Sequence, residues 1–488
     1  MHSNYGQKLK ILFIAAEAYP LIKIGGLGDY AGSLPKAILQ KSFNKYIDVE
    51  LRVVIPFHKQ VVLRNPDLKE IAHVSVPTSN GHSYGSVIQY SEGAQNFYLI
   101  KRKGNASGYD MVYNTDQKKD AKKYIFFSLA CIEWMKQEEW IPNIIHANDW
   151  HTALAIKKIV CERSEQLVFE KIKTVLVIHN LPFMGAGSAN EIKHYGICPS
   201  DSDLLPRWAK ILPLPLGLEA ADQIVTVSPS YAEELMQTEF SYELAPFFKA
   251  HQNKTTGILN GIDYEIWDPE KDGIIDSTYS IFSLEKRKEN KRKLLSQLNL
   301  ENADDKPLLI LISRLTDQKG INLVLESLHQ LLEEDWSAII LGTGQKEYEI
   351  RFRDFETQHP HRLRYFNEYN DNLAHRLYAS GDILLMPSIY EPCGLSQMIA
   401  MRYGCIPVAR AVGGLIDSIN SENSHNRDGY LFQKADAISF STCLKMALND
   451  YRNSMLWRAI QVRAMRKDFS WQKSANQYLE LYQNMLKQ

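Results

Sequence analysis

The chain has 488 residues, of which 45% are hydrophobic and 23% charged, as is usual for a globular protein of two or three domains. Its 56 Lys and Arg residues nearly balance 57 Asp and Glu residues, so the composition indicates neither a nucleic-acid partner nor a membrane surface. A neutral or small anionic ligand fits this balance best, and no apolar run approaches the length of a membrane span. The pattern does not indicate an oligomeric state.

Six cysteines indicate free thiols and a reducing compartment. None forms Cys-x-x-Cys, and none lies beside histidines at zinc-finger spacing. The apolar start at 8–16 is too short for a signal peptide and is followed by Glu17, so we expect a first β-strand there. A cytoplasmic location is therefore expected.

The first half of the chain alternates strands and helices. Strands are expected at 10–16, 51–55, 143–147, 173–178 and 223–227, with shorter strand-like pieces over 71–101. Helices are expected at about 29–40, 120–136 and 150–162. Because the strands are apolar throughout, they indicate a parallel sheet covered on both faces.

The second half restarts the same pattern. Strands are expected at 307–312, 338–341, 362–366 and 382–386, with helices between them and a helical end after about 436. The basic helix expected at 286–298 is interpreted as a solvated face. The predicted fold class is therefore α/β, with two doubly wound Rossmann-like domains at 1–250 and 251–465 and a C-terminal helix at 466–488.

Polar and glycine residues gather where these strands end. In doubly wound sheets, ligands bind at the carboxyl ends of the strands, so residues placed there are candidates for a site. The candidates are Glu17, Lys23, Asp149, His179, Arg314, Lys319, Gly342, Gly344 and Glu391. So many polar strand ends are hard to explain by core packing.

The stretch 388–404 is the most informative of these strand ends. Its turn carries Glu391 and Gly394, and a helix with Gly404 as its stop follows. A carboxylate beside the N-terminus of a helix suits a ligand with hydroxyls and phosphate, such as a sugar nucleotide. The alternative is that Glu391 only caps the helix.

Other strand ends offer cations and small residues. Gly25 and Gly26 allow the backbone to approach a phosphate, and Lys23 adds a charge. Arg314 and Lys319 share one loop and can grip phosphate oxygens, although a plain surface pair is the alternative. His179 and Asp149 can be catalytic or structural. The Asp-Ser-Asp run at 201–203 can hold a metal diphosphate but lies in a polar loop, so we interpret it as solvated.

Ordered motifs run through most of the chain. They are Lys-Ile-Gly-Gly-Leu at 23–27 with Asp29, Ile-His-Ala-Asn-Asp-Trp-His at 145–151, Ile-His-Asn at 178–180, Val-Thr-Val-Ser-Pro at 225–229, Ile-Leu-Asn-Gly-Ile-Asp at 258–263, Ile-Trp-Asp-Pro at 266–269, Ser-Arg-Leu-Thr-Asp-Gln-Lys-Gly at 313–320, Leu-Gly-Thr-Gly at 341–344, Glu-Pro-Cys-Gly-Leu at 391–395, Gly-Gly-Leu at 413–415 and Phe-Ser-Trp at 469–471. In these segments the chain resembles the bacterial glycogen synthases and plant starch synthases. Those enzymes transfer glucose from a nucleotide sugar to the non-reducing end of an α-1,4-glucan.

The resemblance implies a GT-B fold with a donor site in the cleft between the two domains. It implies a retaining, metal-independent transfer from ADP-glucose, with an α-1,4-glucan as acceptor and no cofactor. In the second half it implies that Arg314 and Lys319 bind the donor diphosphate, that Glu391 holds sugar hydroxyls and that Tyr369 stacks on the base. The backbone expected to meet phosphate is that of Cys393, Gly394 and Leu395.

In the first half the resemblance implies a donor motif and a reaction centre. The donor motif and its neighbouring strand end are expected to bind substrate through Glu17, Lys23, Gly25, Gly26 and Asp29. The reaction centre is expected to comprise Asp149, His179 and Asn260. The catalytic set implied for the whole chain is Asp149, His179, Arg314, Lys319 and Glu391.

Several positions depart from the family pattern. Ile24 replaces a threonine, and Gly28 and Tyr30 stand where alanine and valine are commoner. Ile399 stands where other retaining families place a second glutamate and glycogen synthases do not, which keeps this stretch nearer the glycogen synthases. The altered segments are 181–185, 212–219 and 242–246. Most of these departures lie in the half expected to face the acceptor.

Three other interpretations stay open. The donor can be UDP-glucose or the acceptor a different one, within the same class of transferase. A catalytically silent glucan-binding scaffold would be expected to lack the cationic pair or the carboxylate, and Arg314, Lys319 and Glu391 are all present. A nicotinamide dehydrogenase is disfavoured, because no Gly-x-Gly-x-x-Gly follows the first strand.

Overall fold

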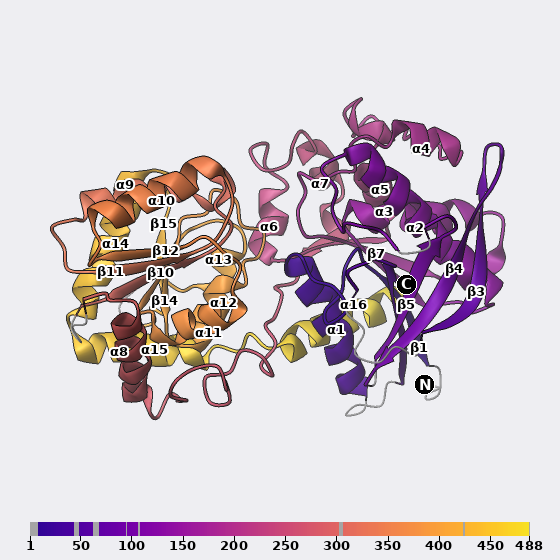
Figure 1. Cartoon of the computed structure of the whole chain (residues 1–488). Helices are drawn as coiled ribbons and strands as arrows, with labels where there is room; N and C mark the ends of the chain where they lie inside the picture. The colour runs from indigo at the N-terminus through magenta and orange to yellow at the C-terminus, as the bar shows by residue number, and fades with distance from the viewer. Residues whose placement is uncertain are drawn as a thin grey trace. The chain divides into compact units, whose positions relative to one another are not determined.

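The computed structural model describes residues 8–42, 48–61, 68–93, 95–105, 108–301, 306–422 and 425–487. The chain divides into two compact units, Met1–Gly261 with Trp471–Gln488, and Ile262–Ser470. Each has a central sheet with helices on both faces, as the strand–helix alternation predicts (Figure 1). Over the described ranges, no helix is long and apolar enough to cross a membrane. All six cysteines are free thiols, as predicted, while the cytoplasmic location stays a prediction.

The described sheet of the first unit is parallel apart from β4, which runs antiparallel to both of its neighbours. Its strands are β1 (Leu9–Ile14), β2 (Val49–Pro56), β3 (Lys69–Thr78), β4 (Gly81–Glu92), β5 (Gln95–Arg102), β6 (Ile144–Asn148), β7 (Lys173–Ile178), β8 (Gln223–Thr226) and β9 (Thr255–Gly257). Their order in the sheet is β3-β4-β5-β2-β1-β6-β7-β8-β9. Only the β3–β4 and β4–β5 pairs are antiparallel. The direction of the strand order reverses between β1 and β6, which is where such sheets bind ligands.

The helices of the first unit cover both faces because its central strands are buried on both sides. They are α1 (Gly26–Ser42), α2 (Gln117–Gln137), α3 (Trp150–Glu162), α4 (Ala189–His194), α5 (Pro213–Ala220), α6 (Pro229–Glu234), α7 (Ala245–Ala250) and α16 (Trp471–Lys487). α1 and α16 lie side by side on one face, and α2, α3 and α5 cover the other (Figure 1).

The sheet of the second unit is parallel throughout its described strands. These are β10 (Leu308–Ile312), β11 (Ser337–Leu341), β12 (Leu363–Phe366), β13 (Ile383–Met386), β14 (Ile406–Arg410) and β15 (Tyr430–Phe432), in the order β12-β11-β10-β13-β14-β15. This is the doubly wound order, and its direction reverses between β10 and β13. The last two strands, β14 and β15, were not among the predicted elements.

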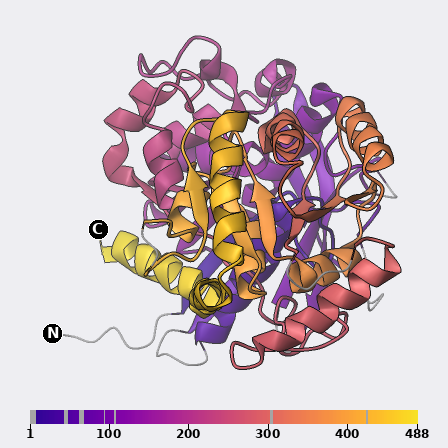
Figure 2. The ribbon, with the colours of Figure 1, turned by 90° about the vertical axis from the view of Figure 1, so that its left-hand side faces the viewer.

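Helices also sandwich the second sheet, as Figure 2 shows from the side. They are α8 (Arg287–Gln297), α9 (Ile321–Gln330), α10 (Lys346–Gln358), α11 (Asp371–Ser380), α12 (Ser396–Arg402), α13 (Gly414–Ser418), α14 (Ala437–Tyr451) and α15 (Ser454–Arg466). α9, α10 and α14 lie on one face, and α8, α11, α12 and α15 lie on the other (Figure 1).

The basic helix α8 corrects one prediction, because it is not simply a solvated face. Lys291 is buried and its Nζ lies 2.7 Å from Oδ2 of Asp382, and buried Arg287 donates to the carbonyl of Gly381. Asp382 also accepts the backbone N–H of Leu308 at 2.9 Å, so these cations neutralise a buried carboxylate at the amino ends of β10 and β13. Lys291 and Asp382 lie 91 positions apart, which hides their contact from local sequence patterns.

The limits of the two units differ from the predicted domains in two places. The first unit continues beyond 250 to Gly261, because β9 pairs with β8 and so extends the first sheet. Its remaining part is α16, which packs beside α1 although it is the last helix of the chain. The second unit ends at Ser470, so the C-terminal helix is a component of the first unit.

Candidate functional sites at two sheet reversal points

The glycine loop after β1 is folded around the carboxylate of Glu17. Glu17 is 1% exposed, and its Oε2 accepts the backbone N–H groups of Ile24 and, at 3.4 Å, of Gly25. Its Oε1 accepts from the hydroxyl of Tyr113 at 2.8 Å. Burial raises the pKa of Glu17, and the three donated hydrogen bonds oppose that rise. Both oxygens of Glu17 thus shape the loop that carries the predicted phosphate contacts.

Lys23 and Asp29, both predicted to bind substrate, contact each other. Nζ of Lys23 lies 2.8 Å from Oδ1 of Asp29, and both side chains are about one-third exposed at 31% and 27%. α1 begins at Gly26, so Asp29 occupies its first turn. The loop therefore brings a cation, a carboxylate and the start of a helix to the reversal point of the first sheet.

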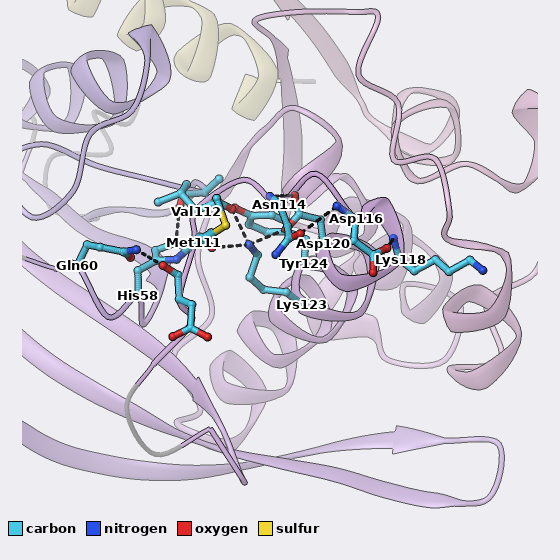
Figure 3. A network of polar contacts seen from close by, with 12 residues as sticks. His58, Gln60, Met111, Val112, Asn114, Asp116, Lys118, Asp120, Lys123 and Tyr124 are labelled. Carbon is cyan, nitrogen blue, oxygen red and sulfur yellow. Dashed lines mark hydrogen bonds and ion pairs between the residues drawn. The ribbon is translucent and has the colours of Figure 1, made fainter. Parts of the chain in front are cut away.

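Lys123, a buried lysine that was not predicted, holds the loop that carries Tyr113, the hydrogen-bond partner of Glu17. Nζ of Lys123 on α2 donates to the carbonyls of Met111 at 3.0 Å and Val112 at 2.5 Å, and to Oδ1 of Asp120 at 2.8 Å (Figure 3). These bonds hold the loop that presents Tyr113 between Val112 and Asn114. Burial lowers the pKa of Lys123, and Asp120 opposes that effect. The only signal in the sequence is the i, i+3 spacing of an acid and a base on a helix.

The same loop is fastened to the start of α2. The backbone N–H of Asn114 donates to Oδ2 of Asp120 at 2.8 Å (Figure 3). Asp116 caps the helix by accepting from the backbone N–H of Lys118 at 3.0 Å. The hydroxyl of Tyr124 also donates to the carbonyl of Val112. Because α2 fixes the loop, Tyr113 reaches Glu17 from a rigid base.

His179 and Asp149 meet at the carboxyl ends of β6 and β7, as predicted. Oδ1 of Asp149 accepts the backbone N–H of His179 at 2.7 Å and that of Asn180 at 3.3 Å. Asp149 has a φ of 55°, which is unusual for a residue other than glycine and is found mainly at functional sites. Burial raises the pKa of Asp149 to about 7, despite the two N–H donors.

The ring of His179 is neutral and its orientation is set by Asn148. Nε2 of His179 lies 2.9 Å from Oδ1 of Asn148, whose Nδ2 donates to the carbonyl of Ile14 at 2.9 Å. Asn148 therefore accepts, so Nε2 of His179 carries the proton and Nδ1 keeps a lone pair. Burial lowers the pKa of His179 to about 3. Asn148 was not predicted, although it lies within the motif at 145–151.

Two side-chain amide oxygens near these strand ends make no hydrogen bond within the described residues. Oδ1 of Asn260 and Oδ1 of Asn180 are buried and have no hydrogen-bond partner among the described residues. Buried polar atoms without partners are rare in folded proteins, so each is suited to accept from a ligand hydroxyl. Asn260 was predicted to line the reaction centre, whereas Asn180 was only part of a motif.

In the second unit, Lys319 and Glu391 meet at the reversal point between β10 and β13. Nζ of Lys319 lies 2.5 Å from Oε2 of Glu391, and the two side chains are 17% and 8% exposed. The buried hydroxyl of Ser388 donates to the same Oε2 at 2.8 Å. Oε1 of Glu391 is then the oxygen available for a ligand. Glu391 is not a helix cap, because α12 begins without a side-chain cap bond.

Arg314 is joined to this pair through Gln318. Its Nη2 lies 3.4 Å from Oε1 of Gln318, whose Nε2 donates to the carbonyl of Tyr390 at 3.1 Å. The backbone N–H of Ile389 donates to the carbonyl of Gln318 at 2.8 Å. The loops after β10 and β13 are therefore tied together by a residue that was not predicted.

Gly320 lets the same two loops touch. Its φ is 66°, and a Cβ there would lie 2.0 Å from the carbonyl oxygen of Pro387. Only glycine adopts this conformation at so close a backbone contact. The loop after β14 closes on the site in a similar way, since the backbone N–H of Gly414 donates to the carbonyl of Glu391 at 3.1 Å.

The other predicted donor contacts lie in the loops around this pair. The turn at 391–395, with Cys393, Gly394 and Leu395, is held by Gln397, whose Nε2 donates to the carbonyls of Cys393 at 3.1 Å and Gly394 at 3.0 Å. Tyr369, predicted to stack on the base, is 77% exposed and follows β12. Asp201 and Asp203 are exposed, as predicted. Over the described part of the chain, no three His, Cys, Asp or Glu side chains are grouped as metal ligands.

Comparisons with known proteins match a family to most of each unit. The family described as starch synthase catalytic domain matches residues 10–250, and glycosyl transferases group 1 matches 296–461. Glycogen synthase from Geobacillus thermodenitrificans is 33% identical over 98% of both chains. Glycogen synthase from Clostridium perfringens is 34% identical over 98% of this chain and 99% of that one.

Two solved structures are similar over nearly the whole chain. The catalytic domain of starch synthase IV from Arabidopsis thaliana, bound to ADP and acarbose, has a TM-score of 0.87 and 29% identity, covering 99% of this chain and 100% of that one. Sucrose-phosphate synthase from Thermosynechococcus elongatus has a TM-score of 0.62 and 16% identity over 98% of this chain and 100% of that one. At that identity the second likeness concerns the fold alone.

Proposed function

Because the chain belongs to the family of glycogen and starch synthases, we propose that it transfers glucose from ADP-glucose to the non-reducing end of an α-1,4-glucan with retention. The family, the GT-B fold and glycogen or starch synthase activity rest on relatives about one-third identical over nearly the full chain. The choice of ADP rather than UDP as the nucleotide of the donor is a more specific part of the proposal. Its support is that the related starch synthase was solved with ADP bound.

The observation that carries the proposal is the pairing of Lys319 with Glu391 at the reversal point of a doubly wound sheet. As the glycosidic bond to the nucleotide breaks, negative charge collects on the leaving diphosphate. Lys319, held beside Glu391, and the exposed Arg314 are cations of one loop, and charges aimed at a leaving group stabilise the transition state more than the ground state. Glu391, oriented by Ser388, offers an oxygen to sugar hydroxyls.

The first unit contributes hydrogen-bonding groups to the proposed reaction. The unprotonated Nδ1 of His179 and the amide oxygens of Asn180 and Asn260 are acceptors for sugar hydroxyls. The strained Asp149 holds the backbone at His179 and Asn180 in place. In this proposal the second unit assists departure of the nucleotide, and the first unit offers acceptors for sugar hydroxyls.

The acceptor is expected to be an α-glucan, but its preferred length is a separate question. Two of the segments that depart from the family pattern, 181–185 and 212–219, pack together in the first unit. The backbone N–H of Leu214 donates to the carbonyl of Met184 at 3.2 Å. We propose that this joint change alters the preferred acceptor length and leaves the donor site unaffected.

A direct assay tests the proposed donor and acceptor together. Labelled ADP-glucose and UDP-glucose would each be offered with glycogen and with short maltodextrins. We expect label to enter glucan from ADP-glucose at least about tenfold faster than from UDP-glucose, a difference of about 1.4 kcal/mol. Faster incorporation from UDP-glucose would contradict the donor assignment, and no incorporation from either donor would contradict the whole proposal.

We also propose that the transfer needs neither a metal ion nor a cofactor. The charge that a divalent cation would supply at the diphosphate is supplied by Lys319 and Arg314. Activity is therefore expected to be unchanged after dialysis against a chelator. Loss of activity that added Mg²⁺ or Mn²⁺ restores would contradict this, and the exposed pair Asp201 and Asp203 would be the first residues to substitute.

A further inference from the structure

Tyr30 lies at the centre of a fully buried group of aromatic side chains in the first unit. Its hydroxyl donates to that of Tyr478 at 2.8 Å and lies 2.9 Å from Nε2 of His146. Nδ1 of His146 lies 2.6 Å from the hydroxyl of Tyr482. The group thus joins α1, which carries Tyr30, to β6 and to the last helix, α16.

The hydrogens of this group can be placed so that each of its hydrogen bonds is made. Burial lowers the pKa of His146 to about 3, so its ring is neutral and carries a single N–H. With the hydroxyl of Tyr30 donating to Tyr478, Nε2 of His146 donates to Tyr30, and the reverse order of donors satisfies the same atoms. In the first order, Nδ1 of His146 accepts from Tyr482. Each of these polar atoms is satisfied, which makes the position of Tyr30 rigid.

The ring of Tyr30 also contacts His179 directly. The two ring centroids are 4.5 Å apart and the planes meet at 78°, an edge-to-face contact. Trp471, the first residue of α16, packs on the same tyrosine with centroids 5.7 Å apart. His179 is therefore held on one side by Asn148 and on another by a ring that α16 fixes in turn.

From this geometry we infer that Tyr30 is a positioning residue for His179 and that α16, the end of the chain, sets the position of Tyr30. The inference rests on the proposed role of His179 in the transfer reaction. Tyr30 covers one side of the imidazole and holds it at one angle, so that the lone pair of Nδ1 keeps one direction. The titratable groups around His179 are Tyr30, His146, His151 and Asp149.

The decisive variant is Tyr30→Val, which introduces the residue commoner in the family and removes the ring beside His179. We expect kcat to fall about tenfold or more while KM for the nucleotide sugar changes by less than about threefold, because the imidazole is misplaced and donor binding is retained. Tyr30→Phe, which keeps the ring, should restore most of kcat at a lower melting temperature. Should Tyr30→Val not fold, Tyr30→Leu removes the same aromatic contact at larger side-chain volume.

A second readout does not depend on activity. Histidine ¹⁵N NMR would follow the titration of His179, assigned with His179→Gln. Because burial alone lowers the pKa of this ring, we expect it to stay neutral at about pH 5 in the wild type and in Tyr30→Phe, and to become protonated there in Tyr30→Val, as water enters. A merely structural role for Tyr30 would change the melting temperature without changing this titration.

Tyr279→Phe is the matched control, since it removes a buried hydroxyl outside this group, one that donates to the carbonyl of Tyr403 at 2.8 Å. It should lower the melting temperature and leave both kcat and the titration of His179 unchanged. Wild-type kcat and an unprotonated His179 at about pH 5 in Tyr30→Val would overturn the inference. Full turnover in His179→Ala would instead contradict the role of His179 in the proposed function, and a changed titration in Tyr30→Val would then still support the positioning.

Discussion

Lys319→Ala is expected to lower the turnover number at least about 100-fold, which corresponds to about 2.7 kcal/mol of transition-state stabilisation. The lysine is 17% exposed and sits 2.5 Å from Glu391, so its charge is held at one place with little water around it. Such a charge stabilises a leaving diphosphate without having to reorganise during the reaction. KM for the donor should rise less than kcat falls, because charge on the leaving group develops mainly in the transition state.

Lys445→Ala provides the matched control for this substitution. Lys445 also pairs with a glutamate of the second unit, Glu334, at 2.9 Å, but its side chain is 56% exposed. An exposed pair contributes little, so this variant should keep wild-type turnover and stability. Wild-type turnover in Lys319→Ala, measured with saturating donor and glycogen, would remove Lys319 from the mechanism.

Gly320→Ala is expected to damage both the stability of the second unit and its activity. The new Cβ would lie 2.0 Å from the carbonyl oxygen of Pro387, at a φ of 66° that alanine adopts only at a cost of about 1–2 kcal/mol. The contact must be relieved by moving the loops after β10 and β13 apart. Lys319, the preceding residue, would then lose its place beside Glu391, and turnover should fall more than about tenfold.

Substitutions at two other glycines distinguish the steric clash at Gly320 from the cost of its positive φ. Gly273 lies in the same unit with open space at its Cβ position, so Gly273→Ala should melt like the wild type. Gly196 has a φ of 64° with open space, so Gly196→Ala should show the backbone cost alone, about 1–2 kcal/mol. Calorimetry would compare the three variants, since domains of this size lose about 2–4 °C of melting temperature per kcal/mol. A Gly320→Ala variant as stable as Gly273→Ala would show that the two loops adapt freely.

The sequence predicted the central strands and the residues at their ends. Apolar runs such as 173–178 and 308–312 are buried on both faces, which forces parallel strands with helical cover whatever the rest of the chain does. Once the strands are known, doubly wound topology places Asp149 and Glu391 at reversal points, with His179 at the end of the neighbouring strand β7. That Lys319 contacts Glu391 agrees with this reasoning, although the structure alone supplies the 2.5 Å distance.

The residues that support the site could not be predicted in the same way. Lys123, Asn148, Ser388 and Gln318 act through contacts that depend on how loops meet, and local periodicity carries no information about that. β15 is three residues long, too short for a period-2 pattern to stand out, and it too was missed. The buried cations of α8 were misinterpreted for a related reason, because their partner lies on a distant strand.

The position of α16 in the sequence also determines the order in which the two units can be completed during synthesis. Ile262–Ser470 is synthesised in full before the helix that completes the first unit leaves the ribosome. At a synthesis rate of about 5–20 residues per second, Tyr478 and Tyr482 are added tens of seconds after their partners Tyr30 and His146. The first unit, whose synthesis begins first, is therefore the last to be completed. Until α16 is synthesised, the face of α1 that packs against it is uncovered in the nascent chain, and chaperones can bind there. A stop codon in the last turns of α16 would accordingly remove contacts to Tyr30, which lies near the N-terminus of the chain.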